Sequence, residues 1–295
     1  MSESTIKYCF GWCPDMPSVH DFDIDSPAVK PLLAKVKGAG AKAAPLKLAK
    51  TADLRAWCSP IENQLTLGSC TANAGVGLVE YYERRACGKH VDASRLFLYK
   101  TTRNLLKWTG DTGAYLRSTL KALALFGVPP EEYWPYVVAD YDKEPSAFLY
   151  SFASNFQAMK YYRLDPPGTT PAALLTAIKT NLAAGLPSFF GFTVYSCYNQ
   201  ASVANQGAIP FPVATDKVVG GHAVMVVGYD DSIKIKNTAA GAPTFTGALM
   251  IRNSWGTTWG DGGYGWLPYE YVLRGQATDW WSLISAEWVD TGQFS

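Results

Sequence analysis

The sequence has little histidine, almost no net charge and no long apolar run. Three histidines, His20, His90 and His222, occur in 295 residues, so few side chains could act as a general base near neutral pH. The 26 Lys and Arg residues balance 25 Asp and Glu residues, which excludes the broad basic field typical of nucleic-acid binding. No stretch approaches the ~18 apolar residues of a membrane-spanning helix. We therefore expect no nucleic acid and no membrane span.

The sequence also lacks a recognisable signal peptide, and its length makes disulfides unnecessary for folding. Residues 1–14 lack an apolar core of signal-peptide length, so we expect a cytoplasmic protein by default, with signal-independent export or a removed leader as alternatives. Six cysteines permit three disulfides, but a chain of 295 residues needs none, and the pairing stays open. Cys9 and Cys13 have no second Cys or His pair nearby, so the sequence predicts no metal and no cofactor.

The composition is that of a folded chain in three parts. It is 48% hydrophobic and 14% aromatic, which argues against disorder. Residues 30–50 hold six lysines and no acid, with Ala, Gly and Pro between them, which is linker composition. This linker is either a surface tether or the junction between a removable N-terminal segment and the rest. The sequence predicts an N-terminal segment over 1–50, a helical domain over 51–165 and a β-rich domain over 166–295.

Hydrophobic periodicity predicts helices in the first domain and mainly strands in the second. An apolar stripe after Cys70 predicts a helix over 71–86, with Glu80 on its polar face. Helices are also expected over 114–126 and over 170–184, the latter with Thr170 as N-cap. Strands are expected over 159–164, 188–194, 223–229, 247–252, 264–267 and 281–288, with irregular loops over 198–221 and 235–245.

Cys70 is the candidate nucleophile. It follows Gly68 and Ser69, and it opens the helix expected over 71–86. A thiol at a helix N-terminus faces unpaired N–H groups and the positive end of the helix dipole, and both favour the thiolate, which is the reactive form. The chemistry then needs a base, a group that orients the base, and donors for an oxyanion.

His222 and Asn253 are the candidates for the base and its orienting partner. His222 follows Gly220 and Gly221 and opens an expected apolar strand, and Asn253 ends the next one. If these strands pair, the two side chains meet at one edge of the sheet, and the Asn carbonyl could accept from one ring nitrogen. Taken singly, His222 could instead be a structural histidine and Asn253 an ordinary turn residue.

At this point the sequence resembles the papain family of cysteine peptidases, with motifs in the family order. The asparagine motif over 253–265 matches nearly position for position, including two Trp, four of its five Gly, Asn and Tyr. The resemblance covers about residues 52–290. The other matching motifs are Gln64 six positions before Cys70, residues 68–70, 111–115, 127–136 and 222–224.

The resemblance implies an α+β, two-domain fold, with a helical left domain, an antiparallel β-barrel-like right domain and the active-site cleft between them. It implies that Cys70 attacks the peptide carbonyl, His222 acts as general base and acid, Asn253 orients His222, and Gln64 serves the oxyanion hole. Trp255 would shield the histidine–asparagine pair from water. The substrate-binding residues implied by the resemblance are Gly113, Ala114, Tyr115, Gly221 and Trp255.

Two positions depart from the family pattern. Leu67 and Thr71 stand where a cysteine and an aromatic residue are usual, so the disulfide that steadies this loop cannot form. We expect packing of Leu65 and Leu67 to hold the loop instead. The motif style is similar to that of the prokaryotic branch of the family.

The sequence thus predicts a monomeric cysteine endopeptidase acting on peptides or proteins. Residues 1–50 are expected to cap the cleft until they are cleaved in the Lys-rich linker, or else to form a permanent strap. Two other functions remain open: an acyltransferase or deamidase with the same thiol chemistry, and a catalytically silent binding protein.

Overall fold

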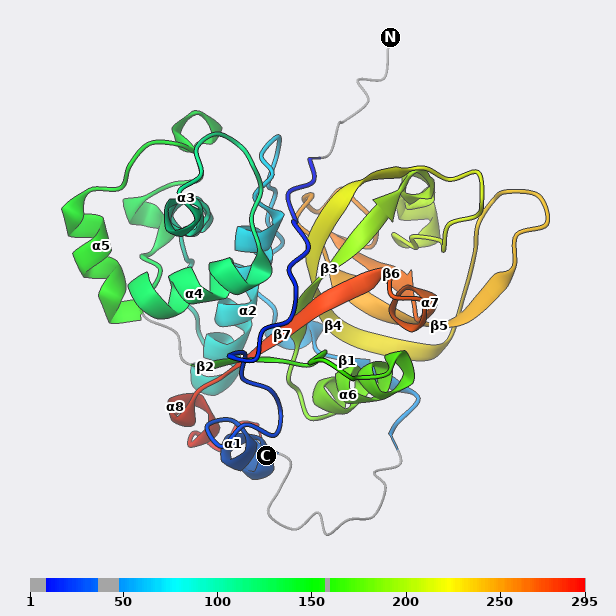
Figure 1. Cartoon of the computed structure of the whole chain (residues 1–295), viewed down its shortest axis with the longest axis horizontal. Coiled ribbons are helices and arrows are strands. Elements are labelled where there is room, and N and C mark those ends of the chain that lie inside the picture. The colour runs from blue at the N-terminus through cyan, green and yellow to red at the C-terminus, as the bar shows by residue number, and fades with distance from the viewer. Residues whose placement is uncertain (1–8, 37–47, 157–159, 295) are drawn as a thin grey trace.

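The computed structural model describes residues 9–36, 48–156 and 160–294. A helical half and a sheet half lie side by side, and the N-terminal segment, dark blue in Figure 1, runs between them. We call residues 9–36 the strap.

The helical half is built around α2. The helices of this half are α2 (Cys70–Cys87), α3 (Arg95–Leu106), α4 (Leu116–Phe126) and α5 (Ala147–Ala153). Helix α2 ends at Gly88, whose φ of 75° is the left-handed conformation that glycine adopts without a Cβ penalty. The helix expected over 114–126 is confirmed by α4, which is followed by Gly127 as its C-cap.

The sheet half is one antiparallel sheet with the strand order β2-β7-β3-β4-β5-β6, and β1 pairs with β4. Among the described residues this sheet is not closed into a barrel. Helix α6 (Pro171–Ala183) carries the expected Thr170 cap, and α7 is Glu270–Leu273. The strands are β1 (Thr51–Asp53), β2 (Lys160–Arg163), β3 (Ser188–Tyr195), β4 (Val218–Lys236), β5 (Thr244–Arg252), β6 (Tyr264–Pro268) and β7 (Ala277–Ile284).

Two strands are longer than the sequence indicated. Ile235 pairs with Phe245 near the end of the β4–β5 hairpin, so the loop expected over 235–245 is confirmed for residues 237–243 and wrong at its two ends. This part of the hairpin alternates buried Ile235 with exposed lysines, a half-buried pattern without the continuous apolar run that marks the strand centre. The strand expected over 281–288 is shifted instead: β7 ends at Ile284, and α8 (Ala286–Val289) follows it.

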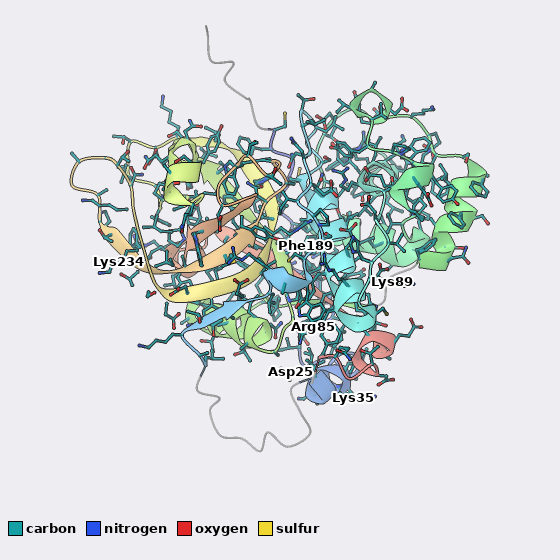
Figure 2. The ribbon with its side chains drawn as sticks, turned by 180° about the vertical axis from the view of Figure 1, so that it is seen from behind. Asp25, Lys35, Arg85, Lys89, Phe189 and Lys234 are labelled. Carbon is teal, nitrogen blue, oxygen red and sulfur yellow. The ribbon has the colours of Figure 1, made fainter. Side chains whose placement is uncertain are left out.

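The core lies where α2 meets the sheet. Phe189 on β3 is fully buried, and Figure 2 shows it at the junction of the two halves. Glu80, expected on a polar face, is also fully buried; its carboxylate accepts from Ser59 Oγ at 2.5 Å and from the Ala93 N–H at 3.0 Å. The helix is covered on nearly every side, so the amphipathic pattern did not predict which face is exposed.

The strap contains a helix that the linker composition concealed. Helix α1 (Lys30–Val36) buries Leu33 and Val36, and Val29 before it is fully buried. Lys35 forms an ion pair at 2.8 Å with Asp290, beside α8, and Figure 2 shows Lys35 at the lower end of the molecule. The expectation of a flexible linker was therefore wrong for residues 30–36, because three apolar side chains dock there. Residues 37–47 lie outside the described residues.

Within the described ranges, no helix combines the length and the apolar character required to cross a bilayer.

Glu80 predicts an unusual pH dependence of stability. Burial raises the pKa of Glu80 to about 7, so its contribution is complete below its ordinary value and is lost as the pH rises through 7. Glu80→Gln should therefore gain stability relative to the wild type between pH 4.5 and 7.5, measured by urea unfolding. Glu132→Gln, on an exposed residue, is the control, and an equal pH response of the two variants would contradict the prediction.

Candidate active site

Cys70 is the first residue of α2, and its side chain is fully buried between the two halves. The backbone N–H groups of Ala223, Gly11 and Thr71 face the sulfur and act to lower the pKa of the thiol. Ala223 lies on β4 directly after His222, so the packing of α2 on the sheet puts the thiol against the histidine strand. Gly11 belongs to the strap, which thus touches the sulfur directly.

His222 and Asn253 meet as the strand pairing suggested. β4 pairs with β5, and His222 Nε2 lies 2.8 Å from Asn253 Oδ1. Because an amide oxygen only accepts, Nε2 carries the proton in this arrangement and Nδ1 is left as an acceptor. Nδ1 is buried without a hydrogen-bond partner among the described residues.

The expected position of His222 at the start of its strand needs correction. β4 begins at Val218, and His222 pairs with Phe192 of β3. The β4–β5 ladder begins only at Met225, opposite Arg252. No β5 residue therefore pairs with His222. The chain that follows β5 runs beside the histidine instead, and Asn253 lies there.

Aromatic rings cover the histidine. Trp255 stacks on the His222 ring with centroids 4.6 Å apart and an interplanar angle of 21°. Phe10 of the strap contacts both rings edge-on, each at 6.0 Å between centroids. Water is thus excluded from the His222–Asn253 bond by one ring of the sheet half and one ring of the strap.

Burial decides the protonation states of this pair. Burial raises the pKa of the Cys70 thiol to about 12, against the lowering by its three N–H contacts. Burial also lowers the pKa of His222 to about 4, although the bond to Asn253 acts in the other direction. The helix N-terminus was expected to favour the thiolate, but with the strap in place desolvation outweighs it, and both groups are neutral near pH 7.

The Gln64 side chain is fixed from both sides. Its Oε1 accepts from Ser254 Oγ at 2.6 Å, and its Nε2 donates to Leu67 O at 2.8 Å. The same Nε2 donates to the carbonyl oxygen of Cys9 in the strap at 3.1 Å. The donor that the sequence assigned to an oxyanion is therefore bound to a strap carbonyl.

The loop before Cys70 is held differently from what the sequence suggested. Leu67 is buried, but Leu65 is 50% exposed and has a φ of 53°, so a packed leucine pair was wrong. Hydrogen bonds hold the loop instead: Tyr136 OH donates to Gln64 O at 2.9 Å and lies 2.6 Å from Ser69 Oγ. Such polar contacts leave no hydrophobic signal in the sequence.

Asp111 ties the same loop to the helical half. Its Oδ1 accepts from the Gly68 N–H at 2.9 Å and from Tyr99 OH at 2.5 Å. No disulfide serves the loop, because Cys70 is a free thiol; Cys13, Cys58, Cys87 and Cys197 are free thiols as well.

The predicted substrate-binding residues lie along the strap, with one exception. Ala114 donates its N–H to Gly11 O at 2.8 Å and accepts from the Cys13 N–H at 3.0 Å. Gly221 O accepts from the Trp12 N–H at 3.0 Å.

Gly113 has a φ of 73°, and a Cβ there would overlap the Gly11 carbonyl. Trp255 contacts the strap through Phe10. Tyr115 is the exception: it is the N-cap of α4, and its ring packs on Trp108 at 5.2 Å.

Sequence reasoning missed several residues of this site. Gly11 and Trp12 lie in a segment without periodicity, and Ser254 and Tyr136 act through single hydrogen bonds. The motif position of Ser254, directly after Asn253, was the one available signal. Contacts made by a chain segment about 60 residues before Cys70 could not be read from local pattern.

Residues 48–274 match the family described as papain family cysteine protease. The structure superimposes on xylellain, a cysteine protease from Xylella fastidiosa, with a TM-score of 0.73 and 30% identity, over 97% of this chain and 99% of that one. An uncharacterized peptidase C1-like protein of Acanthamoeba polyphaga mimivirus is 32% identical over 96% of this chain and 89% of its own length. Cathepsin K of Gallus gallus is 27% identical over 71% of this chain and 55% of its own length.

The fold and these matches define a papain-like cysteine protease. The chain belongs to the papain family of cysteine peptidases, whose substrates are peptides or proteins.

The loop contacts predict a stability effect. Tyr136→Phe keeps the ring but leaves Gln64 O and Ser69 Oγ, both on fully buried residues, without this partner. We expect a loss of roughly 1–3 kcal/mol in the free energy of unfolding, measured by urea denaturation at constant m. Tyr133→Phe, on a ring 47% exposed, should change almost nothing. Equal stability of both variants would show that the hydroxyl does not hold the loop.

Proposed function

We propose that this chain is an endopeptidase that cleaves through a Cys70 acyl-enzyme, with His222, Asn253 and Gln64 as its partners, and that the strap holds the enzyme inactive. The observation that carries the proposal is the sulfur contact with Ala223 N–H, next to a histidine whose Nδ1 is unused while its Nε2 is engaged by Asn253. A thiol and an acceptor nitrogen on adjacent elements are what nucleophilic catalysis by cysteine requires.

In this proposal the proton moves from the Cys70 sulfur to His222 Nδ1, and the thiolate attacks the peptide carbonyl carbon. Asn253 Oδ1 keeps the imidazolium oriented through Nε2–H. The proton on Nδ1 then passes to the leaving amine. His222 next takes a proton from a water molecule, which attacks the acyl-enzyme carbon and releases the acid product and the Cys70 sulfur. Gln64 Nε2 is aimed to donate to the oxyanion, a contact worth roughly 3–4 kcal/mol of barrier in comparable sites.

The strap lies in the site as a peptide that cannot be cleaved there. It presents the Gly11 N–H to the sulfur, where a substrate would present a carbonyl carbon. Its Cys9 carbonyl takes the Gln64 donor, and the burial it imposes keeps the thiol protonated. These two contacts and the burial of the thiol support inhibition rather than a passive structural role.

Charged contacts anchor the strap beyond the cleft. Arg117 on α4 pairs with Asp15 at 2.5 Å and with Asp21 at 2.8 Å. A backbone hydrogen bond adds to these ion pairs: the main-chain N–H of Arg163 on β2 donates to Phe22 O of the strap at 2.6 Å. Helix α1 adds an apolar anchor farther along the strap. Cleavage after α1, in the Lys-rich stretch before residue 51, would cut the strap from the enzyme and let it leave.

Cleavage within a chain, rather than at its ends, is supported by the course of the strap. Its backbone runs continuously from Cys9, whose carbonyl oxygen accepts from Gln64 Nε2, to Cys13, whose N–H donates to Ala114 O. A substrate chain can therefore extend beyond the sulfur in both directions.

Gly11→Ala tests the inhibition. A Cβ on Gly11 would overlap the Gly68 carbonyl, and such overpacking costs about 1–3 kcal/mol. The open population should rise roughly 10-fold or more, and with it the rate of iodoacetamide alkylation at Cys70, followed by mass spectrometry, and of casein hydrolysis. Val19→Ala, on a strap residue 93% exposed, is the control. Unchanged rates in Gly11→Ala would favour a permanent strap that does not inhibit.

The catalytic assignment is tested in the full-length Gly11→Ala chain. Cys70→Ala should abolish hydrolysis of fluorescent casein, and His222→Ala should lower the rate by about 10²–10⁴. Asn253→Ala should lower kcat by about 10² without loss of fold, because the imidazole is no longer held in place. Casein hydrolysis that survives Cys70→Ala would refute the acyl-enzyme.

A further inference from the structure

The peptide unit between Leu67 and Gly68, just before Cys70, is held on both of its sides. Its carbonyl oxygen accepts from Gln64 Nε2 at 2.8 Å. Its N–H donates to the Asp111 carboxylate, at 2.9 Å to Oδ1 and 3.1 Å to Oδ2. A trans peptide unit is planar, and its N–H and C=O point in opposite directions. The carboxylate of Asp111 therefore fixes the direction in which the Leu67 carbonyl faces Gln64.

The Leu67 carbonyl in turn decides where the Gln64 amide points. The amide nitrogen has two N–H donors, of which one goes to Leu67 O and the other to Cys9 O of the strap, where the proposed function places the oxyanion. Ser254 Oγ fixes the other end of the amide by donating to Gln64 Oε1 at 2.6 Å. A charged acceptor on the N–H of a peptide unit also strengthens its carbonyl as an acceptor, so Asp111 tightens the bond to Gln64.

Tyr99 of α3 holds the carboxylate in place. Its hydroxyl donates to Asp111 Oδ1 at 2.5 Å and accepts from the Gly113 N–H at 3.1 Å. Tyr99 is fully buried, and burial together with the neighbouring carboxylate raises its pKa well above the usual range, so the hydroxyl keeps the proton that it donates. Gly113 directly precedes Ala114, which binds the strap backbone. One carboxylate thus links the Gln64 donor to the wall along which the strap lies.

The surroundings of Asp111 leave this linkage as its main role. Among the described residues the carboxylate has no salt-bridge partner, and its hydrogen bonds go to Gly68 and Tyr99. A Cβ on Gly68 would lie 3.2 Å from Asp111 Oδ1, so the close approach depends on the missing side chain. The simpler alternative is that Asp111 only stabilises the loop, in which case every reaction of Cys70 would change together.

We propose that Asp111 is a positioning residue for the reaction: through the peptide unit of Leu67 and Gly68 it aims the Gln64 donor at the oxyanion. This inference rests on the proposed peptidase function and adds a residue to its machinery. Since no disulfide serves the loop, the carboxylate and its partner Tyr99 supply the fixed geometry that an oxyanion site needs.

Two reactions of Cys70 separate positioning from loop stability. Alkylation by iodoacetamide joins sulfur to carbon and expels iodide without forming an oxyanion, whereas hydrolysis of fluorescent casein passes through one. Both are measured in the full-length Gly11→Ala chain, and the ratio of the two rates does not depend on how often the strap opens. Asp111→Ala should lower this ratio about 10-fold, less than the 10²–10³ lost when an oxyanion donor is removed.

Glu132→Ala is the matched control, because it removes an exposed carboxylate from the same half and should leave the ratio unchanged. Asp111→Ala is then repeated in a chain that also carries Gln64→Ala. There it should lower the ratio by less than about 2-fold, because Asp111 acts through Gln64. An unchanged ratio in the first chain, or an equal loss with and without Gln64, would overturn the proposal.

A second measurement does not depend on hydrolysis. The peptide aldehyde acetyl-Leu-Leu-argininal protects a reactive thiol reversibly: sulfur adds to the aldehyde carbon, and the thiol proton ends on the aldehyde oxygen. Its dissociation constant at Cys70 follows from the slowing of alkylation, corrected for the rate without aldehyde. Asp111→Ala should weaken binding roughly 5-fold or more where Gln64 is present, and less than about 2-fold in the Gln64→Ala chain.

The two measurements tell the two proposals apart. If the aldehyde shows this pattern while no chain cleaves casein, the positioning role of Asp111 stands and the proposed peptidase function fails. If aldehyde affinity is the same with and without the Asp111 carboxylate, the positioning role fails, whatever the casein assays give.

Discussion

The packing of α2 against β4 is the constraint on which the site depends. It places the first residue of α2, Cys70, against the backbone of Ala223, and the thiol thereby lies next to the histidine strand. Neither half contains a complete set of reacting groups. The β4–β5 ladder, which starts only after His222, leaves the place that Asn253 occupies. The site is thus set by two packing arrangements, helix on sheet and strand beside strand.

Within this frame, solvent access controls the chemistry. A thiol at a helix N-terminus is favoured as the thiolate, but the same thiol with no access to water is not. The strap supplies part of that burial through Gly11 and Phe10. Its removal would return water to the sulfur and let the helix end and His222 act. One chain segment can therefore account for both geometric blockage and the neutral state of the pair.

The packing of Trp12 follows from the same contact. The strap enters the cleft as an extended chain, and Trp12 lies over Gly191 and Gly221, where a Cβ would overlap it. Asp279 Oδ2 accepts from Trp12 Nε1 at 3.3 Å.

The sequence by itself determined the family, the order of the motifs and most elements, because Cys70, His222 and the 253–265 motif sit in strongly patterned surroundings. It also indicated that β4 and β5 would bring His222 to Asn253. Only the tertiary structure decided that Glu80 is buried, that residues 30–36 form a helix, and that Leu65 is exposed while Tyr136 holds its loop. The contacts of Gly11 and Trp12 also belong to this second group. The reason is physical: burial and hydrogen bonding between segments far apart in the chain depend on what packs opposite, and local periodicity carries no information about that partner.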